Sequence, residues 1–161
     1  MYPWRGIPLF MVLLQIHFKR FVAPFQVANG KETGECVGLQ KYEDLIVWQK
    51  AMDLVAEVYR VVKFLPDEEI YALSDQMRRA AVSIPSNIAE GQERSTTKDF
   101  IKYLFIAKGS KAELETQLLI CARLQYLTQS QIETAQDLLV EIGKMLNAMI
   151  KSLSTKLQHP E

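Results

Sequence analysis

Apolar residues recur at alternating spacings of three and four residues in four successive stretches between Tyr42 and Leu157. Such spacing places them on one face of an α-helix, because the helix repeats about every 3.6 residues. The stretches predict helices over residues 44–64, 70–90, 97–126 and 129–157. Only a few residues separate these helices, and connections this short force neighbouring helices to run antiparallel. The sequence therefore predicts an all-α fold, an antiparallel up-down-up-down four-helix bundle.

Proline, glycine and acidic residues mark the ends of the first two helices. Pro66 is expected to end the first helix, and Asp67 is placed to cap the second. Gly91 is the predicted C-terminal stop of the second helix. Pro85 lies inside that helix and predicts a kink or a local break.

Two threonines predict the starts of the third and fourth helices. Thr96 is followed three residues later by Asp99, and Thr128 is followed three residues later by Gln131. This is the spacing of a capping box, in which the two side chains satisfy free backbone N–H groups at a helix start. The third helix is expected to open at 95–97 and the fourth at Gln129.

Composition limits the class of protein. The chain has 161 residues, 48% of them hydrophobic and 24% charged, which suits a globular domain with its own core. Lys+Arg and Asp+Glu number 19 each, whereas an obligate, strongly basic nucleic-acid-binding protein would have a marked positive excess. Cys36 and Cys121 lie far apart, so the sequence has no disulfide framework and is compatible with a reducing cytoplasm.

Residues 1–40 differ from the rest of the chain. The apolar run from Ile7 to Ile16 is too short for a membrane span, which needs about 20 residues. Lys19 and Arg20 follow it where a signal peptide would have an uncharged cleavage region. We expect a poorly ordered N-terminal extension, or the result of too early a start codon, with a signal or membrane-surface anchor as the open alternative. Residues 41–157 form the predicted bundle, and residues 158–161 form a tail.

Two of the predicted helices have more apolar surface than a monomeric bundle needs. In the first helix the stripe Leu45, Trp48, Met52, Val55, Tyr59 and Val62 is assigned to the core, and a second stripe repeats every seven residues on another side. In the third helix Phe100, Leu104, Ala107, Leu114, Leu118 and Cys121 are assigned to the core. A helix that is apolar on nearly all sides is buried on nearly all sides, so we expect a homo-oligomer. The alternative is that these are scattered surface hydrophobic residues. The expected interface residues are Val47, Leu54, Val61, Phe105, Gly109 and Ile120.

A series of polar residues runs beside the core stripe of the second helix. Its members are Gln76, Arg79, Ser83, Asn87 and Glu90. Buried charges must be paired, so we expect a network that joins Arg79 or Lys111 to Glu90 or Glu113. Two interpretations of this polar seam stay open: it fixes the register of helices or subunits, or it contacts a ligand or RNA.

Residues that catalysis or cofactor binding would require are missing from the predicted bundle. The two histidines, His17 and His159, both lie outside it, which argues against the di-iron sites that some bundles hold. The sequence has no phosphate-binding glycine loop, no Cys/His cluster and no histidine to activate a nucleophile. We expect a non-enzymatic protein without a cofactor or a metal. The basic residues that could contact RNA or a partner are Arg78, Arg79, Arg94, Lys98, Lys102 and Lys108.

Several segments resemble one known family. They are 45–51, 73–91, 100–104 and 107–114, and the stretch Ser83-Ile84-Pro85-Ser86-Asn87-Ile88-Ala89-Glu90-Gly91 is the most specific of them. The chain resembles the bacterial four-helix-bundle proteins encoded in intervening sequences of large-subunit ribosomal RNA genes. Their relatives include the accessory variability protein of diversity-generating retroelements. The resemblance covers residues 41–153, and 1–40 has no counterpart.

The resemblance implies a homopentamer of antiparallel bundles without catalytic activity. In the retroelement relative, a basic pentamer binds nucleic acid and a reverse transcriptase, whereas this bundle is nearly neutral. The residues that mark the family here are Arg78, Arg79, Ser83, Asn87, Glu90, Gly91, Gly109, Ser110 and Glu113. Two hypotheses follow: a cytoplasmic oligomeric scaffold that binds RNA or a nucleic-acid-processing protein through pooled basic patches, or an oligomeric protein–protein adaptor that does not contact nucleic acid.

Overall fold

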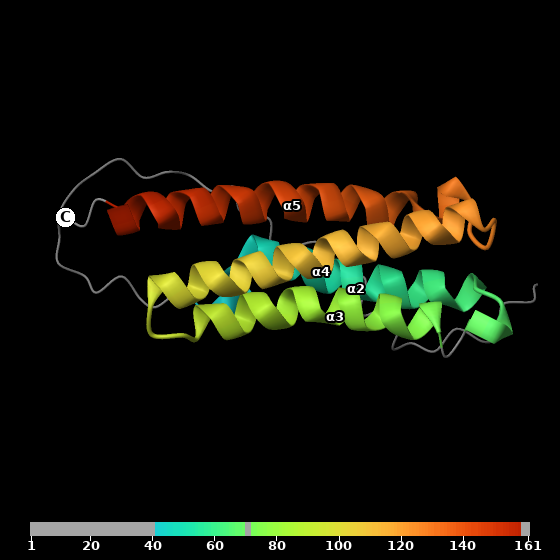
Figure 1. Ribbon diagram of the computed structural model, residues 1–161, viewed down its shortest axis with the longest axis horizontal. Helices are drawn as coiled ribbons and strands as arrows, with labels where there is room; N and C mark the ends of the chain where they lie inside the picture. Colours follow the sequence, from blue (N-terminus) through green and yellow to red (C-terminus); the bar gives the residue numbers. More distant parts are fainter. Residues whose placement is uncertain (1–40, 70–71, 159–161) are drawn as a thin grey trace, which may run out of the picture. The chain divides into compact units, whose positions relative to one another are not determined.

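A computed structural model describes residues 41–69 and 72–158 of the chain (Figure 1). The expectations for residues 1–40 and for 159–161 lie outside the described residues. In the described part the chain is all-helical, without a β-strand. The four long helices are α2 (Ile46–Val61), α3 (Leu73–Gln92), α4 (Thr97–Arg123) and α5 (Gln129–Gln158). Three short 3-10 helices are η1 (Tyr42–Asp44), η2 (Val62–Phe64) and η3 (Asp67–Glu69).

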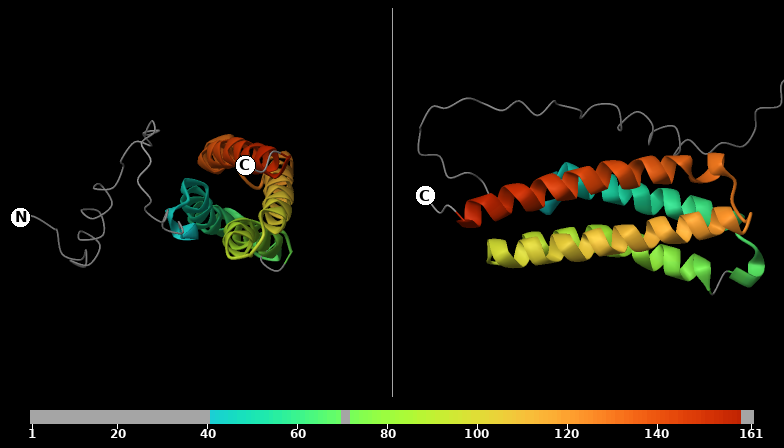
Figure 2. Two further views of the ribbon diagram at one scale, coloured as in Figure 1. Left: turned by 90° about the vertical axis from the view of Figure 1, so that its left-hand side faces the viewer. Right: turned by 45° about the horizontal axis from the view of Figure 1, so that its top comes forward.

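The four long helices form an antiparallel bundle, as predicted. Helix α2 packs against α3 and α5, and α4 packs against the same two helices. In the end-on view the helices surround a common axis, with α2 and α4 at opposite corners (Figure 2, left). None of the described helices combines the length and the apolar character that a membrane span requires.

The core is built from one apolar side of each helix. Fully buried aliphatic residues include Ile84 and Ile88 of α3, Leu114 and Leu118 of α4, and Leu139 of α5. Cys121 is also buried, and its thiol donates to the Met77 sulfur at 3.6 Å. Burial raises the pKa of the Cys121 thiol to about 11, so this cysteine is an unreactive core residue, as the sequence predicted.

The centre of the core side of α2 is shifted from the stripe that the sequence suggested. Val47, Leu54 and Val61, which we expected at an oligomer interface, are buried inside the bundle. Of the stripe assigned to the core, Val62 is buried and Leu45, Trp48 and Val55 pack against the core, whereas Met52 and Tyr59 are exposed. The physical reason is size: small and branched side chains fit the narrow space between four helices, whereas aromatic rings with a polar edge settle where one end meets water.

One of the two backbone hydrogen bonds of each predicted capping box is present. The backbone N–H of Asp99 donates to Thr96 Oγ1 at 3.1 Å, and α4 begins at the next residue after Thr96. The backbone N–H of Thr128 donates to Gln131 Oε1 at 2.7 Å, and α5 begins at Gln129. Both side-chain pairs satisfy N–H groups that a helix start leaves free.

The structure differs from the predicted caps of the second helix at Asp67 and Gly91, and it has no break at Pro85. Asp67 begins the 3-10 helix η3, and it is Glu69 Oε2 that accepts the N–H of Leu73 at the start of α3, at 3.4 Å. Helix α3 continues past Gly91 to Gln92, so Gly91 is not its C-terminal stop. Pro85 lies inside α3, which runs through it without a break.

Helix α4 ends at Arg123, three residues earlier than predicted. Gln125 has a φ of 61°, in the left-handed region. The N–H of Tyr126 donates to the carbonyl of Cys121, and the N–H of Gln125 donates to the carbonyl of Ala122. These two bonds form a Schellman motif, which ends a helix by reversing the backbone.

Candidate functional site

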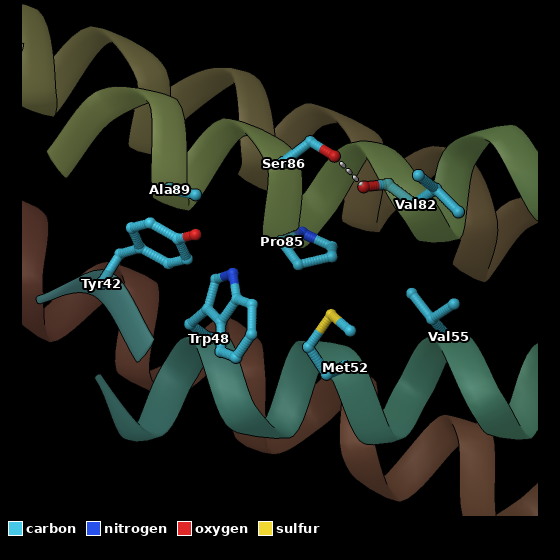
Figure 3. Close-up of a pocket in the computed structure, with 8 residues that line it drawn as sticks. All are labelled: Tyr42, Trp48, Met52, Val55, Val82, Pro85, Ser86 and Ala89. Atoms are coloured by element: carbon cyan, nitrogen blue, oxygen red, sulfur yellow. Dashed lines mark hydrogen bonds between the residues drawn. The ribbon is translucent and has the colours of Figure 1, made fainter. Parts of the chain in front are cut away.

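An apolar groove lies on the surface between α2 and α3 (Figure 3). Trp48, Met52 and Val55 of α2 point toward Val82 and Pro85 of α3 across it. Met52 is 43% exposed and Val82 is 40% exposed, so the apolar surface is open to solvent. We call this surface the α2–α3 groove; its lining is Tyr42, Trp48, Met52, Val55, Val82, Pro85, Ser86 and Ala89.

The two ends of the α2–α3 groove differ in charge. At one end Tyr42 stacks edge-on against Trp48, with 5.4 Å between the ring centroids. The charge of Glu43 raises the pKa of the Tyr42 hydroxyl, and Glu93 adds to that rise, so this end is acidic. At the other end a second hollow is lined by Tyr59, Asp75, Arg78, Arg79, Val82 and Ser83.

Arg78 and Arg79 at this second end bind different partners. The Arg78 guanidinium lies 5.8 Å from the centre of the Tyr59 ring, a cation–π contact that links α3 to α2. Arg79 forms an ion pair with Asp75, one turn earlier on α3, at 3.0 Å. This end of the groove therefore has two cationic side chains against one neutralising carboxylate.

A second cluster, the polar seam, joins α3 to α4. The Asn87 side-chain amide donates to the Ser83 carbonyl at 2.7 Å and to Ser83 Oγ at 2.9 Å. Ser83 Oγ and Ser110 Oγ are 2.8 Å apart, and Ser110 Oγ also donates to the carbonyl of Ile106 at 3.2 Å. The side chains form one connected series of hydrogen bonds in a half-buried position.

The seam continues toward the α3–α4 connection with Glu90, Arg94 and Tyr103. The Tyr103 hydroxyl donates to Glu90 Oε1 at 2.8 Å, and Arg94 forms an ion pair with the same carboxylate. Arg94 Nη2 also donates to the Tyr103 oxygen at 2.7 Å, with the guanidinium 5.0 Å from the ring centre. The hydrogen bonds from Tyr103 and Arg94 hold the pKa of Glu90 below its usual range. The bond to Glu90 raises the pKa of the Tyr103 hydroxyl.

Gly91 lets the two helices of this seam approach each other. A Cβ atom at residue 91 would lie 2.7 Å from Tyr103 Cβ and 2.9 Å from Phe100 Cδ2. Both distances are shorter than van der Waals contact, so this position needs a residue without a side chain.

The predicted polar network has different partners in the structure. Arg79 does not reach Glu90, since it pairs with Asp75 and is exposed. Lys111 pairs with Glu115 at 2.7 Å, and its side chain lies against Gly143 of α5. Glu113 accepts a hydrogen bond from Gln117 at 3.2 Å. The missed members are Ser110 and Tyr103, because a sequence does not show which residue of α4 faces each residue of α3.

The predicted basic residues do not gather in one patch on a single chain. Arg78 and Arg79 lie at the second end of the groove. Arg94, Lys98 and Lys102 lie around the α3–α4 connection, whereas Arg79 is about 20 Å from the end of α3 at Gln92 along the helix axis. Lys108 is exposed farther along α4.

Three of the six predicted interface residues lie on the outer side of α4. Phe105 is 54% exposed, Ile120 is 40% exposed, and Gly109 is exposed as well. A Cβ atom at residue 109 would meet no atom within 4 Å, so packing inside the chain does not require a glycine there. The seam residue Gln76 is also exposed. In the described part of the chain, no group of three or more His, Cys, Asp or Glu side chains could hold a metal ion.

The chain matches one family model and is similar to a solved structure. Residues 43–148 match the family model described as 23S rRNA-intervening sequence protein. The chain is similar to a solved structure of a protein of unknown function from the S23 ribosomal protein family of Bacteroides thetaiotaomicron. The identity is 32%, the match covers 66% of this chain and 99% of the other, and the TM-score is 0.62. No curated protein matches the chain.

Proposed function

The chain belongs to the 23S rRNA-intervening sequence protein family, and from this we propose that it is a non-catalytic cytoplasmic scaffold that assembles from copies of itself. The observation that supports the proposal is the apolar surface that remains exposed to solvent outside the bundle core. The α2–α3 groove and the outer side of α4 are both exposed and both apolar. The assembly that the family resemblance implies is a homopentamer.

The arrangement of polar residues supports a structural role. The side chains of the seam bind one another: Ser83 and Glu90 each bond to a side chain of α4, and Asn87 bonds to Ser83 within α3. The described residues include no histidine, and burial raises the pKa of the Cys121 thiol, so we assign neither residue type a catalytic role in this proposal.

Size-exclusion chromatography with light scattering tests the assembly. Full-length protein at micromolar concentration is expected to elute as a multiple of the 18.5 kDa chain. Exposed apolar surface on a monomer is usually small, and burial of two such faces would stabilise an oligomer. A single-chain mass at every concentration up to 100-fold higher would refute the scaffold.

The partner that we propose for the assembled scaffold is RNA or a nucleoprotein. The supporting observation is the group of exposed cations around the α3–α4 connection, Lys98 and Lys102 with Arg94. One copy has too few of them for tight binding, but copies in an oligomer add their phosphate contacts together. Fluorescence anisotropy with a structured RNA should show binding that weakens as salt increases.

A matched pair of variants sharpens this test. The variant Lys98→Glu should lose RNA affinity, whereas Lys151→Glu on the exposed side of α5 should change it little. If the wild-type protein does not bind RNA even at low salt, where phosphate contacts are strongest, the RNA proposal fails. Protein partners that stay bound after nuclease treatment would then identify a protein–protein adaptor.

A further inference from the structure

The exposed apolar surface includes two faces of different shape. One is the α2–α3 groove, a hollow between two helices. The other is a row on the outer side of α4, which we call the α4 ridge, composed of Phe105, Gly109, Ala112, Leu119 and Ile120. A single helix with a row of side chains can enter a groove between two helices, as ridges and grooves do in helix packing.

The groove and the ridge point in different directions. An α-helix turns about 100° per residue, and this places the ridge on the side of α4 opposite to Leu114 and Leu118, the residues that face the core. Helix α4 occupies the corner of the bundle opposite to α2, whereas the groove opens between α2 and α3 (Figure 2). One chain therefore presents the two faces to two different neighbours.

Gly109 is a second indication that a helix approaches the ridge. A glycine inside a helix costs about 1 kcal/mol relative to alanine, and no contact inside the chain requires one at residue 109. Gly91 is different, because Tyr103 and Phe100 fill the space beside it. A helix of another molecule that packs closely beside Gly109 would require a residue without a side chain there, just as Tyr103 and Phe100 of α4 require one at Gly91.

The charges along the two faces are complementary. The groove has Glu43 and Glu93 at one end and Arg79 near the other, with about 21 Å between Glu93 and Arg79 along α3. Beside the ridge, Lys102 and Glu113 are both exposed and lie about 16 Å apart along α4. The two spacings agree within one helical turn, so Lys102 can lie at Glu93 while Glu113 lies near Arg79.

This register also matches the side chains between the charges. With Lys102 at Glu93 and α4 antiparallel to α3, Phe105 reaches the part of the groove beside Ala89 and Trp48. Gly109 then lies opposite Ser86, where small residues on both helices allow close contact.

We propose that the α4 ridge of one copy binds in the α2–α3 groove of the next copy, in a head-to-tail contact. This inference rests on the proposed self-assembly and names the surfaces that produce it. Because the two surfaces differ, each added copy presents a free groove at one end and a free ridge at the other. Such assemblies close into rings or grow as filaments.

Mixing two variants tests the head-to-tail contact. Val82→Asp places a carboxylate in the groove opposite Glu113 of the ridge, and Phe105→Asp places a carboxylate on the ridge near Glu93; both side chains are exposed, so the fold should persist, as circular dichroism can verify. Each variant alone should elute as a single chain, with association at least about a hundredfold weaker than wild type, because an unpaired charge would be buried. An equimolar mixture should form a one-to-one pair, through the intact ridge of the first and the intact groove of the second.

The outcomes separate the two levels of the proposal. The control Val140→Asp, on the exposed part of α5 away from both faces, should assemble like wild type. If either face variant still assembles alone, or if the mixture yields no mixed pair, the head-to-tail contact is wrong while the scaffold stands. A wild-type protein that is itself a single chain would instead overturn the proposed function.

Discussion

The two sides of helix α4 use small residues for different purposes. On the side facing α3, Gly91 of the partner helix fits against Tyr103, and Ser110 bonds to Ser83 at 2.8 Å. On the outer side, Gly109 has nothing beside it within 4 Å. Contacts within the chain therefore explain the small residues on the inner side, but they do not explain Gly109 on the outer side.

This difference separates what stabilises one chain from what a second molecule would use. Burial and satisfied hydrogen bonds on the inner side contribute to the free energy of unfolding. Exposed apolar residues on the outer side contribute little to it, so substitutions there should leave the fold intact. Paired substitutions on the two sides of α4 should therefore differ in their effect on the free energy of unfolding.

The largest expected effect comes from two adjacent leucines of α4. Leu118 is fully buried and Leu119 is 50% exposed. Leu118→Ala should lower the free energy of unfolding by about 2–5 kcal/mol, because it leaves a cavity in the core. Leu119→Ala should change it by less than about 0.5 kcal/mol. Urea denaturation measures the free energy of unfolding of both variants, and a second protein concentration reveals any contribution of association. Equal losses of free energy in the two variants would contradict the assignment of Leu118 to the core side and of Leu119 to the outer side.

The two glycines should respond in opposite directions. Gly91→Ala should destabilise the chain by about 1–3 kcal/mol, because the new methyl group overlaps Tyr103 and Phe100. Gly109→Ala should stabilise a single chain by about 0.5–1 kcal/mol, because alanine is the better helix former and space is open. Thermal unfolding of both variants decides this, and a stabilising Gly91→Ala would show that α3 and α4 are not in close contact there.

A smaller effect is expected from the hydroxyl groups on the two sides. Ser110→Ala removes the hydrogen-bond partner of the Ser83 hydroxyl and should cost about 1 kcal/mol. Thr116 bonds only to the carbonyl of Ala112 on the exposed side, so Thr116→Ala should be nearly neutral. Denaturant midpoints compare the two variants. If Ser110→Ala is also neutral, the seam does not contribute to stability.

The smallest effect is expected at the exposed end of the seam and depends on pH. Hydrogen bonds from Tyr103 and Arg94 lower the pKa of Glu90, so the folded state favours the charged carboxylate. The resulting stabilisation is complete above the ordinary pKa of a glutamate and is lost as pH falls through the lowered folded value. Glu90→Gln should therefore lower the melting temperature slightly at neutral pH, and the difference from wild type should disappear in acid.

A matched control makes the pH prediction specific. Glu133 is exposed on α5, so Glu133→Gln should follow the wild-type curve at all pH values. A gap between wild type and Glu90→Gln that stays constant from neutral to acid pH would show that the charge of Glu90 is not what stabilises the seam.

Periodicity and capping alone predicted the four helices, their order and two of their starts. Thr96 and Thr128 were identified correctly because a capping box depends only on residues close in the chain. The prediction that Gly91 ends the second helix was wrong, because close contact with α4 rather than a helix end explains the glycine.

Periodicity in the sequence was enough to predict amphipathic helices with more apolar surface than four core stripes use. The folded bundle was needed to show which stripe of α2 is buried, because Val47, Leu54 and Val61 have the same seven-residue spacing as Leu45, Met52 and Tyr59. Spacing fixes which residues share a face, but the width of the space between packed helices selects the face that fits. The partners of the polar seam were decided in the same way, since Ser110 and Tyr103 meet α3 only when α4 folds back along it.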